Sequence, residues 1–120
     1  MGDTETVLKR HLDAFANRNL DAMVDTYAPD AVMVNEHQTF RGHAEIREEF
    51  NRLFDVFSGT DLSENARIAT KTVDEYAYIT WTAVTEQKVY EFVTATFVIS
   101  EGVIQFQTMT AAVRERTTAA

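Results

Sequence analysis

The sequence predicts an α+β domain in which three helices pack on one face of a curved, mostly antiparallel sheet. Up to about residue 57, apolar residues recur every three or four positions, as they do along amphipathic helices. After Gly59 they alternate with polar residues, and Val, Ile, Thr, Tyr and Phe become frequent, which is typical of consecutive strands. Helices followed by a run of strands indicate the α+β class.

Two helices are expected before residue 30. The first begins near Thr4, and its apolar stripe contains Leu8, Leu12 and Phe15, flanked by Val7, His11 and Ala14. Asn19 can cap the second helix through its side-chain oxygen, and Pro29 is expected to end it. The apolar positions of this second helix are Leu20, Met23, Val24 and Tyr27.

A third helix is expected after the turn Phe40-Arg41-Gly42. Its apolar residues form a wide stripe that contains Ile46, Phe50, Leu53, Phe54 and Phe57. Glutamates near its start favour the helix dipole, and Gly59 provides a left-handed residue that ends it.

Five strands are expected from the alternation of side chains. One covers residues 31–35, and the others lie near 62–71, 73–85, 88–99 and 103–113. The breaks at 72–74, 86–87 and 101–102 are short enough for hairpin turns, so the last four strands should form an antiparallel meander.

The meander is expected to have two different faces. One is mainly aliphatic and contains Val73, Ala77, Ile79, Trp81, Ala83, Val93, Ala95, Phe97, Ile99 and Met109. The other is rich in threonine and aromatic residues and contains Tyr76, Tyr78, Thr80, Thr82, Tyr90, Phe92, Thr94, Thr96, Phe106, Thr108 and Thr110. Three helices can cover only one face, so we expect the threonine-rich outer face to form a homodimer.

Composition limits the classes of function. With 120 residues, we expect one domain over residues 1–120. The formal net charge of -8, without a run of Lys or Arg, argues against nucleic acid or membrane partners, and no apolar run approaches the length of a membrane helix. The absence of cysteine excludes disulfides and thiolate zinc sites and fits a cytoplasmic protein.

The segment LKRHLDAFANRNLDAMVDTYAPDAVMV, followed by FRGHAEIREEF, resembles the nuclear transport factor 2-like superfamily, which includes SnoaL-like cyclases and ketosteroid isomerases. The resemblance is strongest over residues 7–50 and extends to about residue 113. It implies a cone-shaped barrel with an internal pocket, on whose concave face the helices pack. Its motif residues are Phe40, Arg41, Gly42, Ile46, Arg47 and Phe50.

The resemblance also implies where catalytic groups would lie. Ketosteroid isomerases abstract a proton with an aspartate on the strand after the second helix, and they hold the oxyanion with a tyrosine and a protonated aspartate. A gap-free comparison places Asn35, His11 and Ala95 at these positions. The Asn35 amide cannot act as a carboxylate base, and the Ala95 side chain has no hydrogen-bond donor. Ordinary steroid isomerase chemistry is therefore not expected.

Three residues are candidates for catalysis: His37 as the general base, with Asn35 or His11 as the hydrogen-bond donor. If the strand continues, His37 shares a face with Asn35, and an imidazole beside an amide could polarise a carbonyl and transfer a proton. The alternatives are that His37 is a solvated loop residue and that His11 is a hydrogen-bonded core residue.

The residues expected to contact a ligand are apolar side chains and one glutamine on the last strand. Ordinary core packing would also explain most of them. They are Phe54, Phe57, Trp81, Ala95, Phe97, Gln107 and Met109. No cofactor is expected. His37, His43, Glu36 and Glu45 lie close in sequence, but their spacing matches no known metal site.

Two hypotheses follow for the function. The first is an enzyme that binds an apolar or carbonyl-containing small molecule and transfers protons without a cofactor, like an isomerase or cyclase. The second is a non-catalytic binding or dimerisation module. The absence of a carboxylate at Asn35 favours the second, and a polar-lined pocket with His37 pointing inward would favour the first.

Overall fold

The computed structural model describes residues 3–116, and of residues 62 and 63 only the backbone. The helices are α1 (Asp3–Ala16), α2 (Leu20–Asp25), α3 (Gly42–Val56) and the short α4 (Leu62–Asn65). The strands are β1 (Tyr27–Asn35), β2 (Thr39–Arg41), β3 (Ala66–Val73), β4 (Tyr76–Val84), β5 (Lys88–Ser100) and β6 (Val103–Glu115). No helix within the described residues is long and apolar enough to span a membrane.

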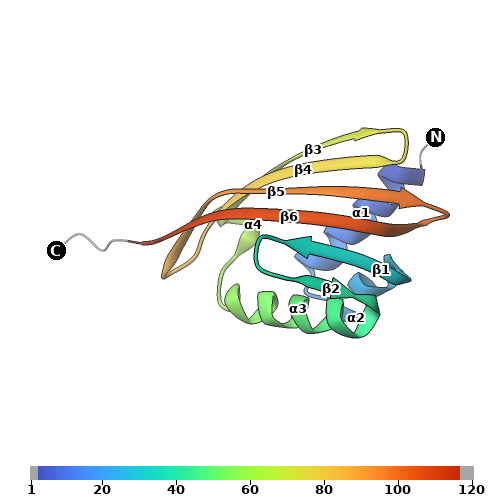
Figure 1. The fold of residues 1–120 in the computed structure, drawn as a ribbon. Coiled ribbons are helices and arrows are strands. Elements are labelled where there is room, and N and C mark those ends of the chain that lie inside the picture. The colour runs from blue at the N-terminus through green and yellow to red at the C-terminus, as the bar shows by residue number, and fades with distance from the viewer. Residues whose placement is uncertain (1–2, 117–120) are drawn as a thin grey trace.

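All six strands belong to one curved sheet with the order β2-β1-β6-β5-β4-β3. Neighbouring strands are antiparallel except for β1 and β6, which run parallel. Figure 1 shows the helices gathered on one side of this sheet. The predicted α+β class is therefore confirmed, but β2 and β3 remain edges and the sheet does not close into a barrel.

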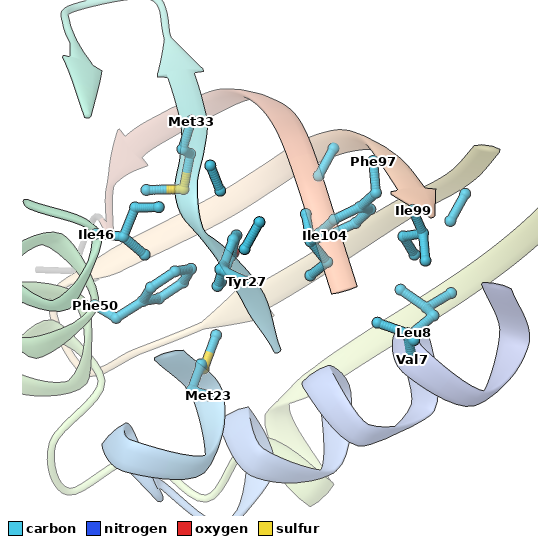
Figure 2. Close-up of a cluster of buried hydrophobic side chains, with 14 of the residues drawn as sticks. Val7, Leu8, Met23, Tyr27, Met33, Ile46, Phe50, Phe97, Ile99 and Ile104 are labelled. Atoms are coloured by element: carbon cyan, nitrogen blue, oxygen red, sulfur yellow. The ribbon is translucent and has the colours of Figure 1, made fainter. Parts of the chain in front are cut away.

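The core lies between the helices and the inner, concave face of the sheet (Figure 2). Ile46 and Phe50 of α3, together with Met23 of α2, lie close to Tyr27 and Met33 of β1. The predicted aliphatic face is the inner one, because its central members are buried: Ala77, Ile79, Ala83, Val93, Ala95, Phe97 and Ile99. Burial of this apolar surface is the main force that holds the helices on the sheet.

Tyr27 was expected in the second helix, but it is the first residue of β1. The helix ends at Asp25 and is capped by Thr26, whose hydroxyl donates to the Met23 carbonyl at 2.6 Å. Tyr27 then pairs with Ile104 of β6, and Pro29 lies where the β1–β6 register shifts. Pro29 therefore sits at an irregularity of the strand rather than ending a helix, as expected for a residue without a backbone N–H.

Two residues lie on the face opposite to the predicted one. Val73 pairs with Tyr76 and is exposed on the outer face, because the β3–β4 turn consists of residues 74 and 75 and lies later than expected. Tyr90 faces inward because β5 contains one extra residue between Tyr90 and Phe92. A one-residue change of register moves a side chain to the other face.

The Arg41-Gly42 turn has a clear local role. Gly42 has a φ of +77°, and a Cβ there would lie 3.4 Å from the Pro29 carbonyl oxygen. The Arg41 backbone N–H is bonded to Glu45 Oε1 at 2.9 Å, which satisfies a free donor at the start of α3. The turn thus directs α3 back across the sheet next to β1.

Ile46 provides a test of the core. Its side chain is fully buried, so Ile46→Ala should lower the free energy of unfolding by about 2–5 kcal/mol through lost burial and a cavity. Glu48→Ala on the exposed side of the same helix should change it by less than about 0.5 kcal/mol. Urea unfolding of both variants checks this, and equal losses would contradict the described packing.

Candidate functional site

A cavity of about 1390 Å³ lies between the inner face of the sheet and helices α1 and α3. Its blind end is formed by buried residues, among them His11, Phe97 and Gln107. Its mouth lies at the β1–β2 turn and the start of β5, where His37 and Lys88 are exposed. Such a concave, mostly apolar space with a few polar groups is the usual form of a small-molecule site.

The strand registers arrange the sheet wall of the cavity in rows. At the blind end, one row crosses the sheet through Met33, Gln107, Phe97 and Ala77. The next row contains Asn35, Met109, Ala95 and Ile79, and the row nearer the mouth contains Ala111, Val93 and Trp81. Cross-strand neighbours lie side by side on one face, so the alanines in these rows leave space beneath the helices.

His11 of α1 lies at the blind end, with its ring centroid 5.5 Å from Tyr27, 6.0 Å from Phe50 and 5.3 Å from Phe97. Its Nδ1 lies 3.2 Å from Thr26 Oγ1. Because the Thr26 hydroxyl donates its hydrogen to the Met23 carbonyl, its oxygen must accept from His11 Nδ1–H. The neutral ring then carries its lone pair on Nε2, so His11 is a hydrogen-bond acceptor toward the cavity, not the donor considered from sequence.

Burial also fixes the charge of His11. Desolvation lowers the pKa of His11 from its ordinary value of 6.5 to about 4. The imidazole is therefore neutral at physiological pH. A base with so low a pKa has little driving force to remove a proton from carbon, so His11 is better suited to hold a ligand than to act as a general base.

Gln107 of β6 supplies a buried amide at the same end. The Tyr27 hydroxyl donates to Gln107 Oε1, since its hydrogen has no other acceptor within residues 3–116. Burial raises the pKa of Tyr27 well above its ordinary value, which keeps the hydroxyl protonated. The Gln107 side-chain NH2 group is left to face the cavity.

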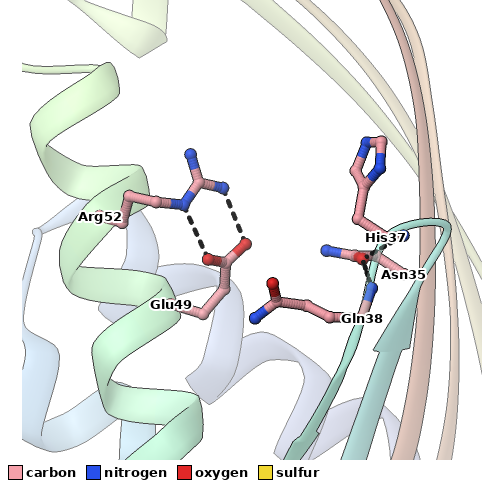
Figure 3. A network of polar contacts seen from close by, with 5 residues as sticks. All are labelled: Asn35, His37, Gln38, Glu49 and Arg52. Carbon is pink, nitrogen blue, oxygen red and sulfur yellow. Dashed lines mark hydrogen bonds and ion pairs between the residues drawn. The ribbon is translucent and has the colours of Figure 1, made fainter.

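Asn35, the last residue of β1, and His37, in the turn between β1 and β2, lie at the mouth (Figure 3). Asn35 Oδ1 accepts from the backbone N–H groups of His37 at 2.8 Å and Gln38 at 2.9 Å, so it shapes the turn. Its amide nitrogen points toward α3 in Figure 3. The exposed His37 ring has no hydrogen bond in the described part of the chain. The structure therefore brings Asn35 and His37 together and places His11 at the opposite end of the cavity.

An ion pair of α3 faces this turn and was not anticipated from sequence (Figure 3). Glu49 is buried and lines the cavity, and both of its oxygens accept from Arg52, with N–O distances of 2.8 Å. The hydrogen bond to Glu49 is the main cause that raises the pKa of Arg52. One signal was present in the sequence, because Glu49 lies three residues after Ile46 and four before Leu53, within the apolar stripe.

The wall near the mouth is aromatic. The Phe57 ring centroid lies 5.7 Å from Trp81 and 5.1 Å from Tyr90, and Trp81 and Tyr90 are stacked. Of the residues predicted to contact a ligand, six line the cavity: Phe57, Trp81, Ala95, Phe97, Gln107 and Met109. Phe54 is the exception, because its ring packs against Phe15, 5.5 Å away, and it does not line the cavity.

No three His, Asp or Glu side chains within residues 3–116 lie close enough together to hold a metal ion. His43, one of the residues weighed as a metal ligand, donates from Nε2 to the Tyr27 carbonyl at 2.8 Å. This bond ties the start of α3 to β1, which is a structural role.

The profile of the SnoaL-like domain matches residues 8–106. The chain belongs to the SnoaL-like domain family. The described geometry agrees with this assignment, because the helices enclose one end of the curved sheet and leave a cavity open at the other. No curated protein matches the chain in sequence.

Several solved structures share the fold of this SnoaL-like chain at low sequence identity. A protein from Kribbella flavida assigned as a ketosteroid isomerase has a TM-score of 0.73 and 9% identity, over 100% of this chain and 85% of its own. A Sinorhizobium meliloti protein assigned as a polyketide cyclase has a TM-score of 0.67 and 18% identity, over 87% of this chain and 93% of its own. An M. tuberculosis LEH-like epoxide hydrolase has a TM-score of 0.64 and 14% identity, over 93% of this chain and 84% of its own.

The burial of His11 predicts a pH-dependent stability. The unfolded chain binds a proton at His11 near pH 6.5, but the folded chain does so only near pH 4. The neutral ring therefore contributes fully to the free energy of unfolding above about pH 6.5, and this contribution is lost as the pH falls toward 4. Between pH 7 and pH 4.5 the loss is about 2 kcal/mol.

His11→Phe should remove this part of the loss. Urea unfolding at pH 7 and at pH 4.5 gives the change in the free energy of unfolding for each protein. Subtracting the variant's change from the wild type's removes the contribution of the carboxylates that titrate in the same range and leaves that of His11. An unchanged loss in the variant would show that His11 is not buried as described.

Proposed function

We propose that the cavity of this SnoaL-like chain binds a largely apolar small molecule and that the chain catalyses proton transfer on it without a cofactor, in the manner of an isomerase or cyclase. The observation that carries the proposal is the cavity itself, whose walls are apolar and whose blind end and mouth each hold polar side chains. The family membership and the isomerase, cyclase and hydrolase names of structural neighbours support the same class.

His37 is the proposed general base. Six side chains that line the cavity are imidazoles or carboxylates able to accept a proton: His11, Asp13, Glu36, His37, Glu49 and Asp61. Asp13 pairs with Lys9, Glu36 accepts from the Ala111 N–H at 3.2 Å, and Asp61 also has a partner. The pKa of His11 is too low for this task, and both oxygens of Glu49 are bound by Arg52. His37 has a ring without a hydrogen bond to residues 3–116, and the nearby Asn35 NH2 group could polarise a ligand carbonyl.

The assay uses an apolar ketone as a probe. Exchange of the α-hydrogens of 2-tetralone in D2O, followed by NMR, reports proton abstraction directly. We expect the protein to accelerate this exchange and His37→Ala to lower the acceleration by a factor of about 100 or more. His43→Ala is the matched control, because His43 lies outside the cavity lining.

An exchange rate that His37→Ala leaves unchanged would remove His37 from the mechanism. If 2-tetralone binds and wild-type protein gives no exchange above the solvent rate, the second hypothesis, a non-catalytic binding module, replaces the first. Two observations favour that alternative: Asn35 has no carboxylate, and the carboxylate of Glu49 is paired.

We further propose that the outer face of the sheet forms a two-fold homodimer. One row of apolar residues crosses five strands on this face: Val32, Phe106, Val98, Tyr76 and Val73. Within it, Val73 is 62% exposed, Tyr76 is 47% exposed and Phe106 is 37% exposed. The helices lie on the other side of the sheet, so a second copy is the simplest cover for an apolar row of this length.

Light scattering tests the dimer. At high micromolar concentration we expect twice the chain mass of 13.6 kDa for the wild type, and the monomer mass for the double variant Tyr76→Asp/Phe106→Asp. Ile68→Asp is the matched control, because Ile68 is 53% exposed but lies on the inner face at the cavity mouth, and it should remain dimeric. A wild type that stays at 13.6 kDa would contradict the proposal.

A further inference from the structure

Two buried side chains at the blind end of the cavity each present a polar atom without a protein partner. His11 is 4% exposed and Gln107 is 2% exposed. Among the described residues, His11 bonds only through Nδ1, to Thr26, and the Gln107 side chain bonds only through Oε1, to Tyr27. No fully enclosed side-chain nitrogen or oxygen in this part of the chain lacks a partner, so His11 Nε2 and the Gln107 NH2 group must border the open space.

The two side chains lie around the same pair of aromatic rings. Phe97 is the direct cross-strand neighbour of Gln107, and its ring centroid lies 5.3 Å from the His11 ring. The Tyr27 ring lies 5.5 Å from the His11 ring and also carries the hydroxyl that binds Gln107. His11 and Gln107 thus share the same two aromatic neighbours at one end of the cavity.

The two atoms have opposite hydrogen-bonding character. His11 Nε2 accepts, because the Thr26 contact fixes the proton on Nδ1. The Gln107 nitrogen donates, because Oε1 is held by the Tyr27 hydroxyl. A hydroxyl group can satisfy both, since it donates one hydrogen and accepts on its lone pairs, whereas a ketone or ether leaves the His11 lone pair unpaired. A buried polar group that loses its water without gaining a partner weakens binding.

We propose that the blind end is a hydroxyl-binding subsite, which selects an apolar alcohol or phenol that enters with its hydroxyl group first. The hydroxyl donates to His11 Nε2 and accepts from the Gln107 NH2 group, and the aromatic and aliphatic walls contact the rest of the ligand. This inference rests on the proposed function, because it assumes that a small molecule occupies the cavity, and it names the chemical class that the cavity takes.

The test compares two probes that differ in one hydrogen-bond donor. 2-Naphthol carries a hydroxyl, and 2-methoxynaphthalene is its methyl ether and can only accept. We expect isothermal titration calorimetry at pH 7 to show that 2-naphthol binds the wild type at least ten times more tightly than the ether.

Two variants locate the preference. His11→Phe removes the acceptor and should bring the affinity ratio close to one, whereas His43→Phe, a matched change outside the cavity lining, should keep it. The double variant Tyr27→Phe/Gln107→Leu removes the donor and its partner together, so no hydroxyl is left unpaired, and it should also reduce the ratio. Gln105→Leu is its control, because Gln105 donates to the Ser100 carbonyl and does not line the cavity.

The outcomes separate this inference from the function on which it rests. Equal affinity of the two probes for the wild type, or a preference that persists in both His11→Phe and the double variant, would overturn the hydroxyl subsite and leave the binding function standing. No binding of either probe would contradict the proposed binding function as well. Circular dichroism of each variant shows whether it is folded, and two independent variants keep the test decisive if one is not.

Discussion

The parallel pairing of β1 with β6 is the interaction on which the site depends. It brings residues near position 30 next to residues near position 106, and it sets Met33 beside Gln107 and Asn35 beside Met109. The bond from the Ile104 N–H to the Thr26 carbonyl at 2.7 Å extends the contact to the end of α2. Without this pairing, β1 and the helix α3 that packs against it would not be held next to the meander, which forms the sheet wall of the cavity.

The polar groups of the cavity fall into two sets, those already paired with protein groups and those with one atom left for a ligand. Near the mouth, Glu49 is satisfied by Arg52, and Asn35 Oδ1 is satisfied by backbone N–H groups. At the blind end, Thr26 and Tyr27 each bind one atom of a neighbouring side chain and thereby orient the other atom toward the open space. Buried polar groups are normally paired, so oriented groups that border a cavity indicate what a bound molecule must provide.

Much of the fold followed from side-chain periodicity. The stripe around Ile46 and Phe50 predicted α3, and the alternation after Gly59 predicted the meander and its buried face. Tyr27 and Tyr90 were misplaced because pairing with a distant strand and an extra residue in β5 decide their positions, and neither is visible in local sequence. The short β2 and α4 were missed for a similar reason, because they are only three and four residues long.

The site was less predictable than the fold. Lining residues on the strands could be recognised from alternation, but the polarity of the site depends on partners far apart in sequence. His11 is set as an acceptor by Thr26, which is 15 residues away, and Gln107 is oriented by Tyr27, which is 80 residues away. Glu49 lies within the apolar stripe of α3, which is a signal of burial, but its pairing with Arg52 and its place in the cavity wall are visible only in the folded chain.

Both the proposed function and the hydroxyl subsite require a small apolar molecule to bind inside the cavity, and the subsite requires its polar group to lie at the blind end. Two-dimensional 1H–15N NMR during titration with 2-naphthol tests this binding most directly. We expect shifts of the Gln107 side-chain NH2 signals and of the backbone amides of Phe97 and Met109, with little change at outer-face residues such as Thr94. Shifts confined to the outer face, or none at saturating probe, would contradict it.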